Sequence, residues 1–187
     1  TKDDEQGLTG AKEQDASKVS PRAMLNLDAE EDGVVYGGCA GGADIHTWFK
    51  PQMTSANNSG TYSIEITGLR GGHSGLNIIE NRGNAVKLLV RTVLAAQKAG
   101  LDIELVELTG GDKHNAIPRE SEAIVCMSAK DAKAMPGVID ECAAGFGIEL
   151  KGVDDRLKIE FGSSDRSGQV MVSADRDRLL RALDAIP

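Results

Sequence analysis

The chain has 187 residues, of which 40% are hydrophobic and 3% are aromatic, and its formal net charge at pH 7 is -8. This length and apolar content are enough for one domain with a core, or for one domain and part of another. The acidic charge argues against nucleic acid or an anionic membrane surface as a partner, because phosphate groups attract basic patches. The small aromatic share also leaves little means of stacking on bases.

The cysteines are odd in number and their spacing fits no zinc motif: Cys39, Cys126 and Cys142. A reduced, cytoplasmic setting is therefore expected. No apolar run approaches the roughly 18 residues of a membrane-spanning helix. The chain starts at Thr1 without an initiator methionine, and we expect it to be a fragment of a longer protein.

The first third of the chain is polar and glycine-rich and shows little periodicity. Adjacent acids, Asp4 and Glu5, stand near its start, and Asp28 follows the short apolar run 23–27. Such acids are usually solvated surface residues, although site residues often follow strands in α/β proteins. The glycine density of the run 33–42 is typical of a hinge between two domains.

From residue 62 the pattern becomes regular. Runs rich in β-branched residues alternate with runs of helical periodicity, which predicts these elements in order: strand 62–67, helix 84–99, strands 103–109 and 122–128, helix 132–146 and strand 157–161. The order β-α-β-β-α-β is that of the ferredoxin-like fold, an α+β architecture. We expect both helices to cover one face of a four-stranded antiparallel sheet.

Both predicted helices have an apolar face. In the first, the residues spaced as one face are Val86, Leu89, Val90, Val93 and Leu94. In the second, Pro136 is predicted to lie in the first turn, where a missing N–H is tolerated. A last helix is expected to run through Leu183, with Ser173 as its cap.

A glycine-rich loop, G-L-R-G-G-H-S-G-L-N-I-I-E at 68–80, joins the first strand to the first helix. Glycines around His73 allow the backbone and the imidazole to approach a ligand closely. An imidazole is a suitable hydrogen-bond donor to a developing oxyanion or a carboxylate. The alternative is a flexible turn with an incidental histidine.

A second glycine-rich loop at 110–119 holds a carboxamide, Asn115, and a guanidinium, Arg119, which suit a substrate carboxylate. Taken alone, Asn115 is more typical of a turn residue before Ile-Pro. The motifs H-x-D, H-E-x-x-H and C-x-x-C are missing from the sequence, so a complete metal site cannot be inferred from it. Glu5 and Asp28 are suited to supply half of one.

Five motifs occur in one order: T-K-D-D-E-Q-G-L-T-G-A, L-N-L-D-A-E-E-D-G, Y-G-G-C-A-G-G, G-L-R-G-G-H-S-G and G-G-D-K-H-N-A-I-P-R-E. Together they resemble the aminoacyl-histidine dipeptidases of the M20 metallopeptidase family, from Thr1 to about residue 128 and more weakly after that. The family has an α/β catalytic domain with two zinc ions and an inserted ferredoxin-like lid. The resemblance implies that 1–41 is a remnant of the catalytic domain, and that 42–187 is a lid and dimerisation domain, incomplete at its C-terminus.

The resemblance also implies roles for the acidic residues near the start. Asp4 matches the general base, Glu5 the zinc ligand beside it, and Asp28 the carboxylate that binds the other zinc ion. The family usually has Glu where Asp4 stands. Because Asp is one methylene shorter, its reach to the water that it must activate is in question.

For the lid, the resemblance implies that His73 steadies the tetrahedral intermediate from a neighbouring subunit and that Asn115 lies near the substrate. We assign Arg119 to substrate binding as well. The family's H-x-D motif, bridging aspartate and late histidine ligand should lie before Thr1 and after Pro187. The chain by itself is therefore expected to be an inactive part of a peptidase.

Two functional readings follow. In the first, the chain is part of a homodimeric zinc dipeptidase that hydrolyses Xaa-His and related dipeptides by attack of a metal-activated water on the peptide carbonyl. In the second, it is a non-catalytic ferredoxin-like module for self-association or peptide binding. An H-x-D motif upstream and a histidine motif downstream in the gene would favour the first.

Overall fold

The computed structural model describes residues 9–18, 20, 22–23, 31–38, 43 and 45–186. It divides into two compact units, Thr1–Trp48 and Phe49–Pro187, which are described separately here. The domain boundary expected from the sequence, at 41–42, falls on residues outside those described and stays a prediction. The assignment of the first unit to a catalytic domain stays a prediction.

The first unit contains a short helix, α1 (Thr9–Lys12), and a 3-10 turn, η1 (Ala16–Lys18). The backbone N–H and the hydroxyl of Ser17 donate to Asp15 at 3.0 and 2.7 Å, and these hydrogen bonds lower the pKa of the Asp15 carboxyl. The acidic residues to which the sequence gave catalytic or metal-binding roles lie outside the described residues: Asp4, Glu5 and Asp28. Their roles stay predictions.

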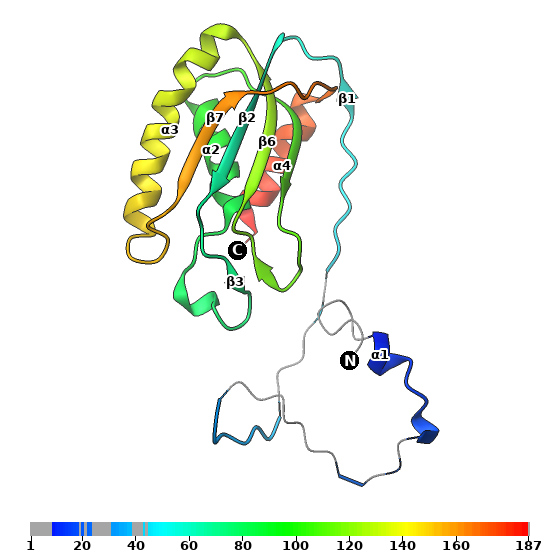
Figure 1. Ribbon diagram of the computed structural model, residues 1–187. Coiled ribbons are helices and arrows are strands. Elements are labelled where there is room, and N and C mark those ends of the chain that lie inside the picture. The colour runs from blue at the N-terminus through cyan, green and yellow to red at the C-terminus, as the bar shows by residue number, and fades with distance from the viewer. Residues whose placement is uncertain are drawn as a thin grey trace. The chain divides into compact units, whose positions relative to one another are not determined.

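The second unit is built on a four-stranded antiparallel sheet (Figure 1). Its strands are β2 (Gly60–Thr67), β4 (Glu104–Gly110), β6 (Ser121–Met127) and β7 (Lys158–Ser163). The spatial order is β4-β6-β2-β7, with every neighbouring pair antiparallel. Since this is the strand order of a split βαβ, the ferredoxin-like prediction is confirmed.

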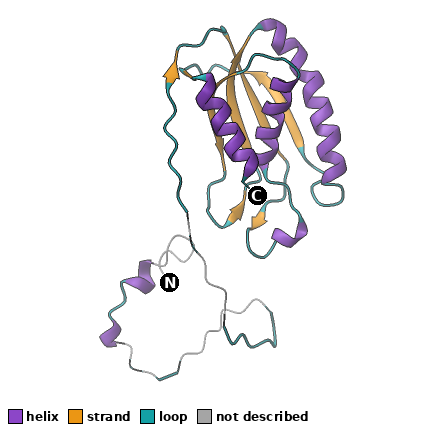
Figure 2. Ribbon diagram, turned by 180° about the vertical axis from the view of Figure 1, so that it is seen from behind, coloured by secondary structure: helices purple, strands orange, loops and turns teal. Residues whose placement is uncertain are grey.

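Three long helices lie on one face of this sheet (Figure 2). They are α2 (Ala85–Lys98), α3 (Ala129–Glu149) and α4 (Ser173–Ala185). The Asn84 side chain caps α2 by accepting the Lys87 N–H, as an N-cap residue does. The predicted last helix is present as α4, but the prediction that Ser173 caps it is wrong: Ser173 is its first residue, and the N-cap is Val172, without a side-chain hydrogen bond.

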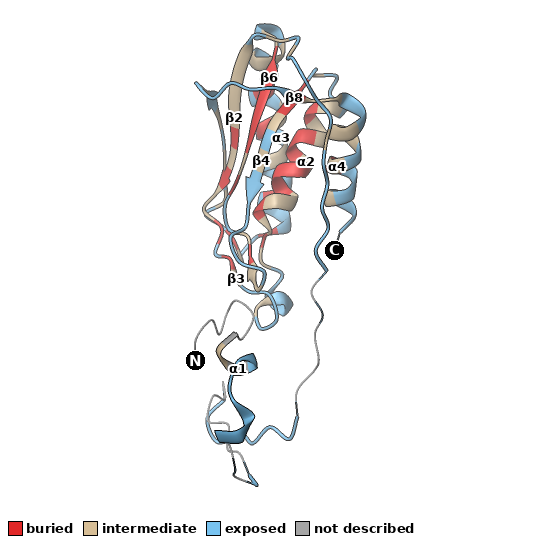
Figure 3. Cartoon of the chain, turned by 90° about the vertical axis from the view of Figure 1, so that its right-hand side faces the viewer, coloured by how far each residue is buried: buried red, intermediate tan, exposed pale blue. Residues whose placement is uncertain are grey.

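Apolar side chains between the helices and the sheet form one core (Figure 3). On β2 the inward residues alternate, with Ile64 and Ile66 fully buried, as expected for a sheet covered on one face. The predicted face of α2 is buried or partly buried, but Leu88 is buried as well. α2 is buried on more sides than the sequence predicted because it packs against both α3 and α4.

One sequence prediction about α3 is wrong. Ser128 accepts the N–H of Asp131 at 3.1 Å and caps the helix, which therefore begins at Ala129 and places Pro136 well inside it instead of in the first turn. Pro136 is exposed, so water can hydrogen-bond to the carbonyl that the missing N–H leaves unpaired.

Two small ribbons complete the unit. β1 (Met53–Thr54) pairs with β8 (Val170–Met171), and β3 (Gly72–His73) pairs with β5 (Ala116–Ile117). A 3-10 turn, η2 (Ile78–Glu80), lies between β3 and α2. Within the described part of the chain, no helix is both long and apolar enough to span a membrane.

Candidate functional site

The two glycine-rich loops singled out in the sequence meet beyond one end of the sheet (Figure 1). In the β3–β5 ribbon His73 is the partner of Ala116, and the Ser74 N–H donates to the Asn115 carbonyl at 2.8 Å. Backbone pairing between loops more than 40 residues apart in the sequence therefore brings His73 and Asn115 together.

The imidazole of His73 is exposed and has a defined orientation. Its Nδ1 accepts the backbone N–H groups of Gly75 at 3.0 Å and Leu76 at 3.2 Å. A ring nitrogen that accepts hydrogen bonds carries no proton, so the neutral ring has its proton on Nε2. His73 therefore presents a hydrogen-bond donor on the side of the ring away from its own loop.

A circuit of polar contacts shapes the loop around His73. The His73 N–H donates to Asn77 Oδ1 at 2.8 Å, and Asn77 Nδ2 donates to Glu80 Oε1 at 2.7 Å. Arg82 Nε donates to Glu80 Oε2 at 3.0 Å, and Arg82 Nη1 donates to the Gly71 carbonyl. The hydrogen bonds from Asn77 and Arg82 hold the pKa of Glu80 below its ordinary value, which favours the carboxylate that the circuit needs.

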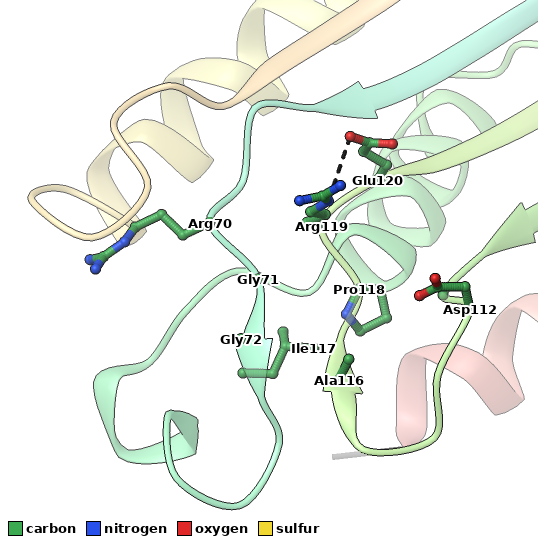
Figure 4. A pocket seen from close by; sticks show the side chains of 10 residues that line it. Arg70, Gly71, Gly72, Asp112, Ala116, Ile117, Pro118, Arg119 and Glu120 are labelled. Atoms are coloured by element: carbon green, nitrogen blue, oxygen red, sulfur yellow. Dashed lines mark ion pairs between the residues drawn. The ribbon is translucent and has the colours of Figure 1, made fainter. Parts of the chain in front are cut away.

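A pocket lies beside the ribbon (Figure 4). It is lined by Arg70, Gly71, Gly72, Gly111, Asp112, Ala116, Ile117, Pro118, Arg119 and Glu120. In Figure 4 the Arg119 side chain lies next to Glu120, at 3.8 Å from its carboxylate, whereas Arg70 extends away from them. The predicted Arg119 thus lines the pocket, while His73 lies on the neighbouring ribbon and Asn115 immediately before β5.

The structure therefore places His73 on the β3–β5 ribbon, Asn115 immediately before β5 and Arg119 two residues after β5, at one end of the sheet. Nothing in the described residues tests their roles. No group of three or more His, Cys, Asp or Glu side chains in the described part of the chain is placed to hold a metal ion. The polar residues that shape the loop were not predicted from the sequence, although the opposite charges of Glu80 and Arg82, two positions apart, indicate a local ion pair.

Comparison with known proteins identifies the class to which this ferredoxin-like unit and its ribbon belong. Residues 54–153 match the peptidase dimerisation domain of the M20 peptidases. The chain therefore belongs to the M20 peptidase family.

Two similar proteins are named as dipeptidases. The chain is 32% identical to the cytosol non-specific dipeptidase of Escherichia coli over 189 aligned positions, which cover 100% of the chain and 39% of that protein. The crystal structure of aminoacylhistidine dipeptidase from Vibrio alginolyticus matches with a TM-score of 0.69 and 32% identity, over 74% of this chain and 28% of that one. The chain thus spans less than half the length of either relative.

Proposed function

We propose that this chain is the lid, with an adjoining part of the catalytic domain, of a zinc-dependent dipeptidase that hydrolyses Xaa-His and related dipeptides. The observation that carries the proposal is the exposed ring of His73, whose Nδ1 accepts two backbone N–H groups, which leaves Nε2 as the donor position. The relatives support it, since both are named as dipeptidases. The name of the Escherichia coli relative also supports a cytosolic location.

His73 has the chemistry of an oxyanion donor. Attack of water on a peptide carbonyl turns its oxygen into an anion in the tetrahedral intermediate. A donor whose direction is already fixed stabilises that charge without reorganising during the reaction. The exposed ring has to meet a substrate bound elsewhere, which is consistent with a homodimer in which the lid of one subunit closes on the other.

Arg119 and Asn115 suit the substrate's carboxylate in this scheme. The Arg119 side chain is 69% exposed, and its ion pair with Glu120 is long, at 3.8 Å. Because an exposed pair of that length contributes little, a substrate carboxylate can displace it at small cost and take bidentate hydrogen bonds.

The two proposed metal ligands lie outside the described residues. Glu5 and Asp28 are of the type that binds zinc, and each would ligate one of two ions, whose other ligands would come from outside this chain. Bound zinc lowers the pKa of water and polarises a carbonyl. Asp4 would take the proton of the attacking water as general base.

The test is His73→Ala in the complete protein. Turnover of an Xaa-His dipeptide should fall about a hundredfold to a thousandfold, because one oxyanion donor is lost. KM should change little, since the ring meets its partner mainly in the transition state. The melting temperature should also change little, because water can take over the exposed N–H groups of Gly75 and Leu76 that the ring releases. The matched control is His114→Ala, a histidine of the neighbouring loop that is also exposed, which should leave kcat unchanged.

Mixing two inactive variants tests whether His73 acts on the active site of the other subunit. If His73 acts across subunits, combining His73→Ala protein with Glu5→Ala protein restores part of the activity, because one site in the mixed dimer is complete. Full turnover in His73→Ala would refute the proposed role. A complete protein that binds dipeptides without hydrolysing them would favour the non-catalytic module.

A further inference from the structure

A buried carboxylate, Asp154, lies beneath the loop that carries His73. It stands in the turn between α3 and β7 and is only 3% exposed. One oxygen accepts the Arg70 N–H at 2.7 Å and the other accepts the Gly83 N–H at 2.7 Å. These two N–H groups are at the two ends of the 70–83 loop. A single carboxylate therefore joins the two stems of the loop, one at Arg70 and the other at Gly83.

The packing around Asp154 brings its turn close to both stems. A Cβ atom on Gly68 would lie 2.0 Å from the Arg156 carbonyl oxygen, and one on Gly83 would lie 3.0 Å from Leu150 Cδ1 and 3.4 Å from Asp154 Oδ2. A side chain at Gly68 would push this stem away from the turn, because the atom that it meets belongs to the backbone, whereas at Gly83 the Leu150 side chain would have to move by a few tenths of an ångström. Glycine on each stem thus provides the approach that the carboxylate needs.

Backbone N–H groups satisfy this buried charge. In the described part of the chain no Lys or Arg forms an ion pair with Asp154, and no buried side-chain nitrogen or oxygen lacks a hydrogen-bond partner. Hydrogen bonds to an ionised acceptor are stronger than neutral ones, but only while both donors stay in place. The charge therefore favours the closed spacing of the stems over any alternative spacing.

The Gly83 stem is also connected to the other half of the ribbon. Two residues further on, the Ala85 N–H donates to the Pro118 carbonyl at 2.8 Å, directly after β5. A displacement of the Gly83 stem would therefore move β3, which the loop carries, and β5, which is bonded to Ala85 through Pro118.

We propose that Asp154 is a positioning residue, which clamps both stems of the 70–83 loop and so fixes the place of His73. Its effect on turnover rests on the proposed function of His73, whereas its effect on the loop does not. Asp154 touches no substrate and acts only through the backbone.

Hydrogen exchange of this chain tests the clamp directly. Asp154→Asn keeps the volume and one acceptor but turns an NH2 donor toward an N–H donor. Exchange in peptides covering 70–83 should accelerate by about tenfold to a hundredfold, the factor that one hydrogen bond to a charged group implies. Peptides from β6 should not change. Unchanged exchange at 70–83 would overturn the proposal.

The matched control is Asp155→Asn. Asp155 is the next residue and is exposed, and it accepts the Gly152 N–H at 2.8 Å within its own turn. Exchange at 70–83 should stay as in the unmodified chain, and equal acceleration in both variants would overturn the clamp. If Asp154→Asn does not fold, Asp154→Glu, which keeps the charge but displaces the oxygens, should show the same local acceleration.

Kinetics of the complete protein test whether the clamp acts through His73. Asp154→Asn should lower kcat about tenfold with little change in KM, and should add no further loss in a His73→Ala background, because the two residues then act as one unit. An equal loss in both backgrounds would show a general structural effect and overturn the positioning role. If His73→Ala alone leaves turnover unchanged, the proposed function fails, and exchange still decides the clamp.

Discussion

The layer of helices on the sheet and the loop that carries His73 are held together by different forces. Leu89 of α2 and Val125 of β6 are fully buried among apolar neighbours. In the loop the large apolar side chains point to solvent, with Ile78 59% and Ile79 83% exposed. Hydrogen bonds, and close backbone contacts at glycines, hold the loop instead of apolar burial.

The difference matters for function. Apolar burial is non-directional and spread over many contacts, so it stabilises the whole layer together. A few directed hydrogen bonds fix particular atoms but add less free energy, so such a loop opens locally at lower cost than the core. The residues proposed to act on the substrate lie on the loop held by hydrogen bonds, where atoms can be placed precisely and local opening is reversible.

The largest effect on stability is expected in the layer. Leu89→Ala should lower the free energy of unfolding by about 2–5 kcal/mol, because it removes a fully buried side chain and leaves a cavity. Urea denaturation of the chain measures this. Ile148→Ala on α3, where the side chain is 80% exposed, is the control and should stay within about 0.5 kcal/mol. Equal losses in the two variants would contradict the picture of a single core on the sheet.

Gly68→Ala tests the boundary between layer and loop. The residue has φ +82°, and a Cβ atom would lie 2.0 Å from the Arg156 carbonyl oxygen. Backbone strain and the clash together should cost about 2–4 kcal/mol.

Gly152→Ala separates strain from clash, because Gly152 has a similar φ of +79° with nothing within 4 Å of its Cβ position. It should cost only about 1–2 kcal/mol, the strain alone. If the two alanine variants lose the same stability, the close approach at Gly68 contributes nothing.

Most of the fold could be predicted because its signals are local. The β-branched runs and the apolar face of α2 are visible within a few residues, and they are enough to give the order β-α-β-β-α-β. Pro136 shows the limit. The cap at Ser128 extends α3 backwards, whereas periodicity alone started the helix later. Helix ends depend on capping more than on the pattern of the interior.

Some residues of the site could likewise be predicted from local sequence, and others could not. The glycines around His73 mark its loop in the sequence, and the resemblance supplies its role. Asp154 could not be found, because its partners Arg70 and Gly83 are 84 and 71 residues away and it binds their backbone, which leaves no trace in residue type. For Asp4, Glu5 and Asp28 the sequence remains the basis of the assignment.

One polar anchor lies in the layer and resembles those of the loop. Glu104 of β4 is 7% exposed and accepts the backbone N–H groups of Asn57 and Asn58, each at 2.9 Å. Burial raises the pKa of Glu104, but the hydrogen bonds from these backbone and side-chain groups outweigh it, so the pKa lies below its ordinary value. A folded-state pKa below that of the unfolded chain means that the carboxylate stabilises the fold above the unfolded pKa, and that this contribution is lost as the pH falls through the folded value.

Glu104→Gln should therefore have a small effect near neutral pH, about 1–2 kcal/mol, as expected for Gly152→Ala, because the amide keeps one acceptor and loses the charge. The stability difference from the unmodified chain should shrink between neutral pH and an acidic pH below the folded-state pKa of Glu104, where the native carboxyl is protonated. Urea denaturation at both pH values measures it, with Glu160→Gln on β7, which is exposed, as the control. A difference that does not change with pH would mean that Glu104 acts by shape alone, and that charged anchors belong only to the loop.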